Sequence, residues 1–284
     1  MPAPNFMIIW NASYPKSGNT YLRSFLCSYF FSENGKFDFN LLDNIKNFPG
    51  IHYSKNKTDS NLEASRNWII NQNYFFDKTK LNFLKTHNSM QLFEGNSFTT
   101  KDQTIGAIYI YRDPRNIITS LKNHYSMNYQ SAFEFMIDNK SFIIQDSYDN
   151  DKSNFTYLGS WVNHYKSWFS TKNFKVMLIK YEDLQDKKFE IFIDVIKFIN
   201  FLSDKDEKIN ENKLEKSIKS TNFNVLKNNE KNYGFVEAVK SKISGQKVNF
   251  FNLGFNNRWK KILPKDFQIS MSDYFKEDLK FLKY

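Results

Sequence analysis

The sequence predicts an α/β fold in which helices cover both faces of a central parallel sheet. Three short apolar runs, at residues 6–10, 105–111 and 174–181, have the composition of buried parallel strands. Apolar residues at helical spacing follow each run, as in repeated strand–helix–strand units. Because 284 residues suffice for one large core, we expect residues 1–284 to form a single three-layer domain.

The first predicted strand, at residues 6–10, leads through a polar loop at residues 13–20 into a helix. The helix is indicated by an apolar stripe at Leu22, Phe25, Leu26, Tyr29 and Phe30. A tight loop that opens a helix brings free backbone N–H groups together with the positive end of the helix dipole. This order of elements predicts a P-loop-type fold with a phosphate site in the loop.

The loop departs from the G-x-x-x-x-G-K-[ST] motif in an informative way. Gly18 and Thr20 fit the motif, whereas Asn19 takes the place of its lysine and Ser13 the place of its first glycine. The cation lies at Lys16 instead, two residues before the glycine. We therefore expect a nucleotide phosphate site that differs from an ordinary ATP or GTP site. The alternative is a strand, turn and helix with a solvated lysine.

The next predicted strand covers residues 81–87 and ends in Lys85 and His87. Before it, residues 33–80 are polar and irregular, with one possible helix at residues 62–71. Ligands of open α/β sheets gather at the carboxyl ends of strands. Polar side chains at this strand end are therefore candidate site residues.

Arg112 directly follows the strand at residues 105–111. Asp113 is a suitable helix N-cap and Pro114 a suitable first helical residue, which places Ser120 two turns into a helix. A guanidinium and a hydroxyl at this point can hold a second phosphate. The alternative is an ion pair of Arg112 with Asp113 or another nearby carboxylate, and an ordinary helix position for Ser120.

The second half of the chain continues the alternation of strands and helices. The expected elements are a polar loop at residues 140–155, a helix at 158–169, a strand at 174–181, a helix at 189–199, one short helix near 213–220 within a polar segment at 203–249, and a last helix from Pro264.

Composition excludes several classes of protein. The formal charge is +10, but the lysines are dispersed, without the basic stripe of a nucleic-acid-binding protein. No apolar run approaches the length of a membrane span and no export signal is visible, so we expect a cytoplasmic protein. Cys27 is the only cysteine and the four histidines lack ligand spacing, so we expect no disulfide within the chain and no metal site.

Four separated motifs carry a resemblance to a known family. The loop YPKSGNT at residues 14–20 resembles the YPKSGTT loop of cytosolic-type sulfotransferases, which use 3′-phosphoadenylyl sulfate (PAPS). Residues 85–87 are similar to the family's KTH, residues 181–184 to its YEDL, and residues 221–226 to its TSF-x-x-M segment. These motifs occur in the family's order, and the likeness runs from residue 6 to about residue 260.

The resemblance implies transfer of a sulfuryl group from PAPS, without a metal, to a hydroxyl or amine of a small-molecule or carbohydrate acceptor, which leaves adenosine 3′,5′-bisphosphate (PAP). His87 would be the general base, Lys16 would neutralise the bridging oxygen and Lys85 would assist the sulfate. The alternative for His87 is a satisfied histidine at a strand end. The implied cofactor-binding residues are Lys16, Ser17, Gly18, Asn19, Thr20, Tyr21, Arg112, Ser120, Tyr181, Thr221, Phe223, Leu226, Phe251, Asn252 and Gly254.

The chain departs from the family pattern F-x-R-K-G-x-x-G-D-W-K at residues 250–260. Asn252 and Leu253 take the place of the Arg-Lys pair, so one cationic contact to the 3′-phosphate is missing. Candidate replacements are Arg258, Lys247 and Lys260. Tyr21 takes the place of an adenine-stacking tryptophan. The family's dimer-forming TV-x-x-x-E segment is not recognisable, so the oligomeric state stays open.

Three other functions remain as alternatives. A P-loop kinase shares the phosphate loop but requires a lysine where Asn19 lies. A nucleic-acid-binding protein accounts for the charge, and a non-catalytic nucleotide binder accounts for the missing Arg-Lys pair. Residues 33–80, 125–155 and 230–250 are expected to surround the acceptor with apolar walls. Phenols, sterols, sugars and small alcohols all stay open as acceptors.

Overall fold

The computed structural model describes residues 8–77, 79–144, 151–240 and 245–284. Its central sheet has four parallel strands in the order β2-β1-β3-β6. The strands are β1 (Ile8–Ala12), β2 (Asn82–Thr86), β3 (Thr104–Tyr111) and β6 (Lys175–Lys180). The parallel sheet predicted from the apolar runs is confirmed; Phe6 and Met7, which we expected in the first strand, lie outside the described residues.

Two hydrophobic cores lie on opposite faces of the sheet, because successive strand residues point to opposite sides. In β3, Tyr109 belongs to one core, and its neighbours Ile108 and Ile110 belong to the other. In β1, Trp10 lies in the same core as Tyr109, and its neighbour Ile9 lies in the core of Ile108 and Ile110. A strand buried on both faces reads as a continuous apolar run, which is why these strands were visible in the sequence.

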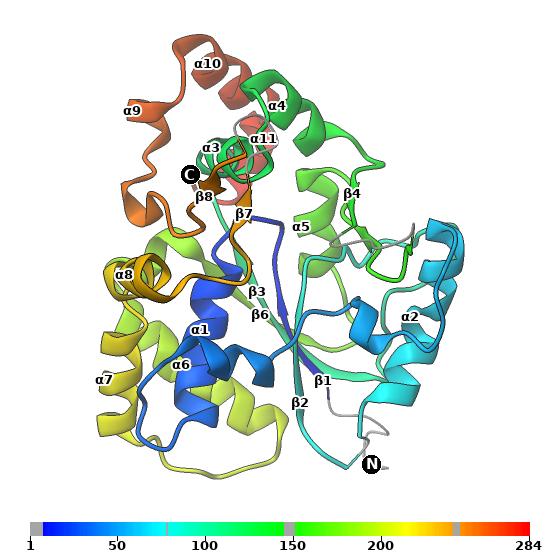
Figure 1. Ribbon diagram of the computed structural model, residues 1–284, viewed down its shortest axis with the longest axis vertical. Helices are drawn as coiled ribbons and strands as arrows, with labels where there is room; N and C mark the ends of the chain where they lie inside the picture. The colour runs from blue at the N-terminus through cyan, green and yellow to red at the C-terminus, as the bar shows by residue number, and fades with distance from the viewer. Residues whose placement is uncertain (1–7, 78, 145–150, 241–244) are drawn as a thin grey trace.

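Helices cover both faces of the sheet, as Figure 1 shows. One core contains residues of α1 (Asn19–Phe31), α6 (Lys188–Leu202), α7 (Glu211–Ser220) and α8 (Phe223–Tyr233). The other contains residues of α2 (Asn61–Phe75), α3 (Pro114–Tyr125), α4 (Tyr129–Ile137), α5 (Trp161–Phe169), α10 (Lys265–Tyr274) and α11 (Lys276–Phe281). This arrangement confirms the predicted three-layer fold.

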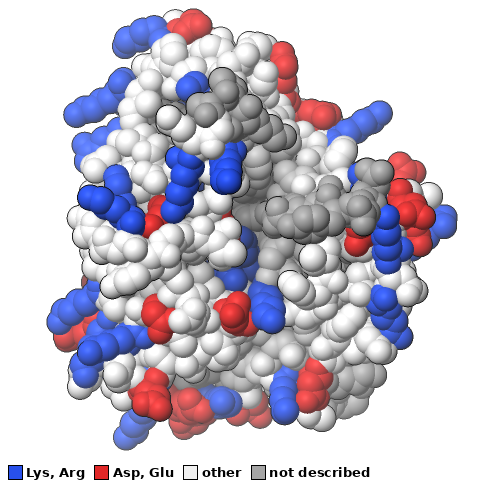
Figure 2. All heavy atoms as spheres, in the orientation of Figure 1, with Lys and Arg blue, Asp and Glu red and all other residues white. Residues whose placement is uncertain are grey.

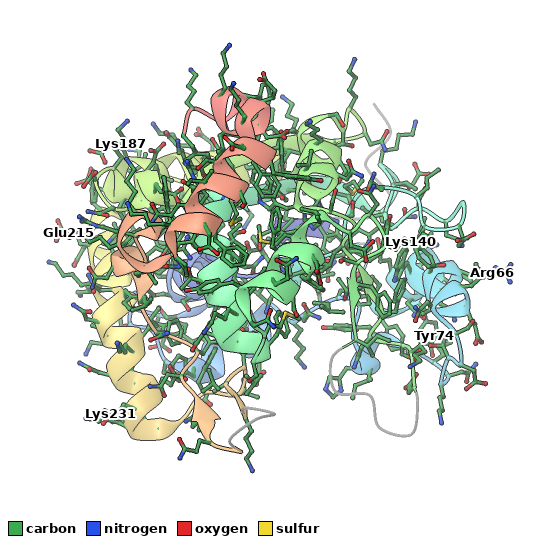
Figure 3. The ribbon with its side chains drawn as sticks, turned by 90° about the horizontal axis from the view of Figure 1, so that it is seen from above. Arg66, Tyr74, Lys140, Lys187, Glu215 and Lys231 are labelled. Carbon is green, nitrogen blue, oxygen red and sulfur yellow. The ribbon has the colours of Figure 1, made fainter. Side chains whose placement is uncertain are left out.

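Most charged side chains lie on the outside of these layers. In Figure 3, Arg66, Lys187, Glu215 and Lys231 lie at the rim of the molecule and point outward. Inside, aromatic rings fill the cores; the rings of Phe25 and Phe192 stack with centroids 3.6 Å apart. Cys27 is free and buried in one of the two cores.

The remaining elements are short. They comprise the 3₁₀ helices η1 (Phe39–Asn44), η2 (Ile51–Tyr53), η3 (Tyr181–Leu184) and η4 (Gly254–Asn256), the helix α9 (Trp259–Ile262), the hairpin β4 (Phe142–Ile143) with β5 (Thr156–Tyr157), and the hairpin β7 (Val239–Lys240) with β8 (Lys247–Val248).

Besides the four-residue α9, two longer helices, α4 and α8, were not predicted. In α8 the buried residues of the inner face are Leu226 and Glu230, so a carboxylate interrupts the apolar stripe. In α4 the segment is short, and Ala132 and Met136 are its only fully buried residues. Both helices begin at an asparagine N-cap, Asn128 or Asn222, which is the local signal that sequence reading missed.

Candidate active site

A cavity of about 700 Å³ lies at the carboxyl ends of the central strands. Parallel pairing explains this position: Ala12 at the end of β1 lies opposite Thr86 in β2 and opposite Tyr109 in β3. The predicted site residues that line the cavity are Lys16, Gly18, Asn19, Thr20, Tyr21, Lys85, His87, Arg112, Ser120, Tyr181, Phe223, Phe251, Asn252 and Gly254. The fold thus brings together motifs that are far apart in the chain.

Three of the residues expected to bind cofactor do not line the cavity: Ser17, Thr221 and Leu226. All three are fully buried. The backbone N–H of Ser17 donates to the carbonyl of Tyr14 (3.3 Å), so it is not free for a phosphate. The Thr221 hydroxyl donates to the Ser217 carbonyl (2.7 Å), and Leu226 packs in a hydrophobic core. These residues form the layer beneath the cavity wall.

The loop before α1 has the backbone of an anion-binding turn. Lys16 and Gly18 have positive φ angles, 66° and 105°. A side chain at Gly18 would collide with the Tyr181 ring, so both the backbone and the space require glycine there. Asn19 and Thr20 begin α1, where N–H groups have no intrahelical partner. The cavity therefore receives free N–H donors from the start of this helix.

Asn19 stabilises the loop by its side-chain amide. Its Nδ2 donates to the Asn11 carbonyl (3.0 Å) and to the Ser13 hydroxyl (3.3 Å), and its Oδ1 accepts from Asn11 Nδ2 (3.0 Å). The residue that takes the place of the P-loop lysine is thus a structural tie between strand and loop. The cation of this loop is Lys16.

The pKa of the Lys16 side chain lies well below the usual value for lysine. Its Nζ lies 4.0 Å from the centroid of the Phe250 ring. Burial is the main cause that lowers the pKa of Lys16 to about 7; Glu237 opposes this shift, and Lys85 and Arg112 add to it. An anion placed beside Lys16 favours the charged ammonium. This side chain is therefore suited to bind an anionic group.

His87 is oriented by the main chain of the loop after β1. Its Nδ1 lies 2.8 Å from the Ser13 carbonyl oxygen, which accepts only, so Nδ1 carries the proton. The unprotonated nitrogen is then Nε2, which has no hydrogen-bond partner among the described residues. Burial, and secondly Lys85, lower the pKa of His87 to about 3, so the ring is neutral near neutral pH. His87 is thus only half satisfied, and its free nitrogen is a candidate base.

A second histidine holds the main chain at His87. His164 Nε2 donates to the His87 carbonyl (3.0 Å), and the Tyr109 hydroxyl donates to His164 Nδ1 (2.9 Å). Burial lowers the pKa of His164 to about 4, which keeps this chain of hydrogen bonds neutral. No spacing in the sequence connects α5 with β2, so this support was not predicted.

Arg112 and Ser120 form a second polar region of the cavity. The Arg112 guanidinium donates to the carbonyls of Lys16 and Gly254 (both 3.2 Å) and lies 4.3 Å from the centroid of the Tyr181 ring. The alternative ion pair with Asp113 is wrong, because Asp113 pairs with Arg115 (2.8 Å). The Nε of Arg112 is buried without a partner.

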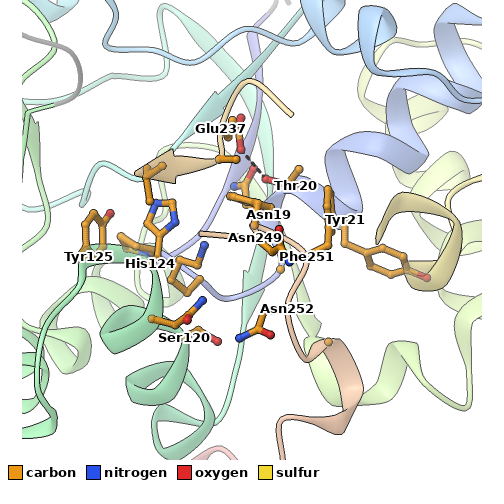
Figure 4. Close-up of a pocket in the computed structure, with 18 of the residues that line it drawn as sticks. Asn19, Thr20, Tyr21, Ser120, His124, Tyr125, Glu237, Asn249, Phe251 and Asn252 are labelled. Atoms are coloured by element: carbon orange, nitrogen blue, oxygen red, sulfur yellow. Dashed lines mark hydrogen bonds between the residues drawn. The ribbon is translucent and has the colours of Figure 1, made fainter. Parts of the chain in front are cut away.

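Ser120 lies near Asn252 toward the lower part of the view in Figure 4, away from Thr20. Its hydroxyl accepts from Asn257 Nδ2 (3.1 Å). The proposed replacements for the missing Arg-Lys pair, Arg258, Lys247 and Lys260, do not line the cavity. The backbone carbonyl of Asn252 accepts a hydrogen bond from Lys227 Nζ (2.8 Å).

Aromatic rings form the wall between the loop and the C-terminal segment. Tyr181 stacks on Phe255 with centroids 4.9 Å apart and planes at 21°. A Cβ at Gly254 would approach the Phe223 ring to 2.7 Å, so glycine is required there. Tyr21 meets Phe255 edge to face at 6.2 Å. Flat aromatic walls of this kind suit a nucleotide base.

Glu237 was not predicted from the sequence, yet it lines the cavity and has three polar partners, of which Thr20 and Lys85 also line the cavity and Arg23 does not. Its carboxylate accepts from the Thr20 hydroxyl (2.9 Å), Arg23 (2.6 Å) and Lys85 (3.0 Å). Figure 4 shows the contact with Thr20. The two cations hold the pKa of Glu237 well below its usual range, despite the opposing effect of burial. Thr20 and Glu237 are 217 positions apart, so no local pattern connects them.

The residues around the cavity fit an anion with more than one charged group. Its described lining includes the cations Lys16, Lys85, Arg112 and Lys240. In Figure 2, Lys and Arg side chains lie in and beside the hollow near the middle of the face. The partnerless Nε of Arg112 is a buried donor that a phosphate oxygen can satisfy. The described residues contain no group of three or more His, Cys, Asp or Glu side chains placed to hold a metal.

The fold and the cavity define a class of protein: a P-loop-type α/β protein whose cavity has two separate polar regions, each suited to an anionic group. Comparison with known proteins identifies the family. The sequence profile of the sulfotransferase domain matches residues 8–283. The chain belongs to the sulfotransferase domain family.

Curated relatives agree with this assignment. Mouse sulfotransferase 1E1 is 27% identical over 98% of this chain and 84% of its own, and human sulfotransferase 1E1 is 29% identical over 90% and 78%. Firefly (Photinus pyralis) luciferin sulfotransferase is 22% identical over 94% of this chain and 70% of its own.

Solved structures show the same fold. Mouse sulfotransferase SULT7A1, in complex with PAP, superposes with a TM-score of 0.52 at 16% identity and covers 97% of this chain and 85% of its own. Retinol dehydratase, in complex with androsterone and PAP, gives 0.51 at 16% identity over 99% and 82%.

The predicted activity class is therefore confirmed: the protein is a sulfotransferase that uses PAPS as its donor. The kinase and non-catalytic alternatives are set aside by the family match. Within the described part of the chain, no helix has the length and apolar composition needed to cross a membrane.

Proposed function

We propose that this sulfotransferase acts in the cytoplasm on a hydroxyl group of a small, partly apolar molecule. Lys16, Lys85 and His87 serve the transfer, and Arg112 with Ser120 holds the 3′-phosphate of the donor. The observation that carries the proposal is the convergence of these side chains, from the ends of three neighbouring strands, on one cavity. Binding of a two-phosphate nucleotide uses both polar regions at once.

When bound, PAPS supplies the sulfuryl group, which moves to the acceptor oxygen and leaves PAP. The chain contributes positioning and charge. The N–H groups that open α1 and the Thr20 hydroxyl bind the 5′-phosphate, and Lys16 and Lys85 neutralise the charge that grows as the bond to sulfur breaks. No metal is required, because two lysines already supply positive charge at that point.

The role of His87 follows from its tautomer. Because Nδ1 donates to the Ser13 carbonyl, Nε2 accepts the proton of the acceptor hydroxyl. The ring is a weak base in the free protein, since burial and Lys85 depress its pKa. A bound anion beside it favours the imidazolium and raises the pKa of His87 toward the operating range. The base is thus strengthened when the donor is present.

The acceptor side of the cavity supports an apolar body for the acceptor. His87 shares the cavity with Tyr125, Ile144, Val239 and Phe250. Burial raises the pKa of Tyr125 to about 12, so its hydroxyl remains protonated and neutral. Such a wall favours a phenol, a sterol or an aliphatic alcohol over a sugar, because a sugar would leave many hydroxyls unpaired.

Calorimetric titration with PAP, ADP and ATP in the absence of metal tests the nucleotide site. We expect micromolar binding of PAP and little binding of ADP or ATP, because only PAP places phosphates at both regions. Turnover of PAPS with a panel of phenols, sterols, alcohols and sugars then tests the acceptor class. Preference for ATP, strengthened by Mg²⁺, or turnover with sugars alone, would contradict the proposal.

A further inference from the structure

The Glu237 carboxylate accepts hydrogen bonds from three side chains that are also suited to hold an anionic ligand. Its three partners are the Thr20 hydroxyl and the Arg23 guanidinium on α1, and the Lys85 ammonium on β2. Glu237 itself belongs to the segment that leads into the β7–β8 hairpin. The preceding residue, Val236, is 90% exposed, whereas the Glu237 side chain is 21% exposed. This segment therefore turns one carboxylate from the surface into the cavity.

Arg23 is the unexpected member of the set. Its side chain is 8% exposed on a helix whose neighbours Leu22 and Phe25 lie in a hydrophobic core. A guanidinium stays charged even when buried, so it needs an anion nearby. Its NH2 group donates to the Leu42 carbonyl (2.9 Å), and its Nε has no partner. In this structure Glu237 is its anion.

The proposed binding mode of PAPS uses the same hydrogen-bond donors. Thr20 and Lys85 are two of the residues proposed to hold the phosphosulfate end of PAPS. An anion at that position and the Glu237 carboxylate would lie within a few ångströms of each other, where like charges repel. Both cannot be held by Thr20 and Lys85 at the same time.

We propose that Thr20, Arg23 and Lys85 form a cradle for the anionic 5′ end of the nucleotide, and that Glu237 is an internal anion which the nucleotide displaces. Arg23, which does not line the cavity while Glu237 is paired with it, is then a further binding residue of the nucleotide, outside the motifs that define the site. The inference rests on the proposed nucleotide site. It predicts that the cradle keeps its charge balance in both states, since one anion replaces the other.

The first test is the affinity of Glu237→Gln for PAP, measured by calorimetry. Removal of the competing charge should tighten binding by about tenfold or more, within the usual range of coupling between two ligands for one site. Glu215→Gln is the matched control. Glu215 is an exposed residue of α7 (Figure 3), and its substitution changes the net charge by the same amount. Unchanged or weaker binding by Glu237→Gln would overturn the proposal.

Arg23 is tested in the background of that variant. If Arg23 binds the nucleotide, Arg23→Gln combined with Glu237→Gln should bind PAP about tenfold more weakly than Glu237→Gln alone. If Arg23 only neutralises Glu237, the double variant should bind as tightly as the single variant, and the binding role of Arg23 is refuted. Comparison of the wild type, Arg23→Gln, Glu237→Gln and the double variant gives the coupling directly.

A second variant covers loss of folding, because Glu237→Gln leaves two buried cations without an anion. Glu237→Asp keeps the charge but shortens the side chain, so the carboxylate cannot reach all three donors, and PAP binding should again tighten. Circular dichroism and melting curves identify the folded variants. If neither the wild type nor any variant binds PAP, the proposed nucleotide site itself fails. If the wild type binds PAP and the variants bind it no better, only the displacement fails.

Discussion

The two polar regions of the cavity differ in how their charge is balanced. At the end of β1 and β2, the cations Arg23 and Lys85 are paired with the carboxylate of Glu237. At the end of β3, Arg112 makes hydrogen bonds only to neutral carbonyls and lies over the face of the Tyr181 ring. The first region already holds an anion from the chain, whereas the second holds none among its described contacts.

This difference shows that predicted binding residues need not be equally available. A ligand reaches Arg112 without displacing a hydrogen-bonded carboxylate, although Glu182 also interacts electrostatically with Arg112. At the cradle formed by Thr20, Arg23 and Lys85, a ligand gains only the difference between its own contacts and those of Glu237. We therefore expect the second region to contribute more to affinity and the first more to turnover.

The largest expected effect is a loss of turnover on substitution of His87, which lies beside the first region. His87→Ala should lower kcat by about 100-fold or more, because no base then takes up the proton of the substrate hydroxyl. The affinity for PAP should change little. Initial rates with PAPS and an acceptor measure kcat, and calorimetry measures the affinity. His52→Ala is the control, since His52 is an exposed histidine of η2. Near-normal turnover of His87→Ala would remove His87 from the mechanism.

The second prediction concerns affinity at the other region. Arg112→Gln should weaken PAP binding by about 10- to 100-fold, since hydrogen bonds to charged groups contribute about 1.5–3 kcal/mol. Adenosine 5′-phosphate, which lacks the 3′-phosphate, should lose little affinity. Calorimetry with both nucleotides measures the contrast, and Arg66→Gln on the exposed face of α2 is the control. Equal losses for both nucleotides would place Arg112 elsewhere on the ligand.

The third prediction concerns pH and Lys16. Its pKa is about 7 in the free protein, so the neutral amine predominates above that pH, while a bound anion prefers the ammonium. Binding must then take up a proton, and PAP affinity should fall by about tenfold between pH 7 and pH 9. Lys16→Arg, which stays charged, should reduce this dependence. An equally steep decline in Lys16→Arg would assign the proton to another group.

The smallest expected effect is at Ser120. Ser120→Ala should weaken PAP binding by about fivefold, because it removes one hydrogen bond from an uncharged donor and leaves Arg112 in place. Asn257 loses one acceptor but keeps its bond to the Asn116 carbonyl (2.7 Å), so the fold should be maintained. Melting temperature provides the control for folding. A loss as large as that of Arg112→Gln would mean that Ser120 acts chiefly through Asn257.

Much of the site was readable before the structure, because it lies where strands end. Lys16, His87 and Arg112 each follow an apolar run, and strand ends of a parallel sheet share one edge. Three of the expected cofactor-binding residues do not line the cavity, because position within a motif does not fix the direction of a side chain. Ser17, Thr221 and Leu226 lie within or beside motifs, but their side chains point into the layer beneath the cavity.

The residues that sequence reading missed are joined to the site by long-range contacts. Glu237, His164 and Asn257 meet Thr20, His87 and Ser120 across 217, 77 and 137 positions, respectively. A single sequence contains no periodic signal for contacts of this kind. Glu237 in particular lies in a lysine-rich polar segment, where a lone carboxylate is ordinarily a solvated charge.

The sequence by itself determined the fold class, the phosphate loop and the family, because each depends on local spacing: apolar runs, a glycine between strand and helix, and short motifs in a fixed order. Only the tertiary structure decided the protonated nitrogen of His87 and the partner of each cation. Those features depend on which carbonyl or carboxylate lies within hydrogen-bond distance, and burial makes that single neighbour dominate the electrostatics.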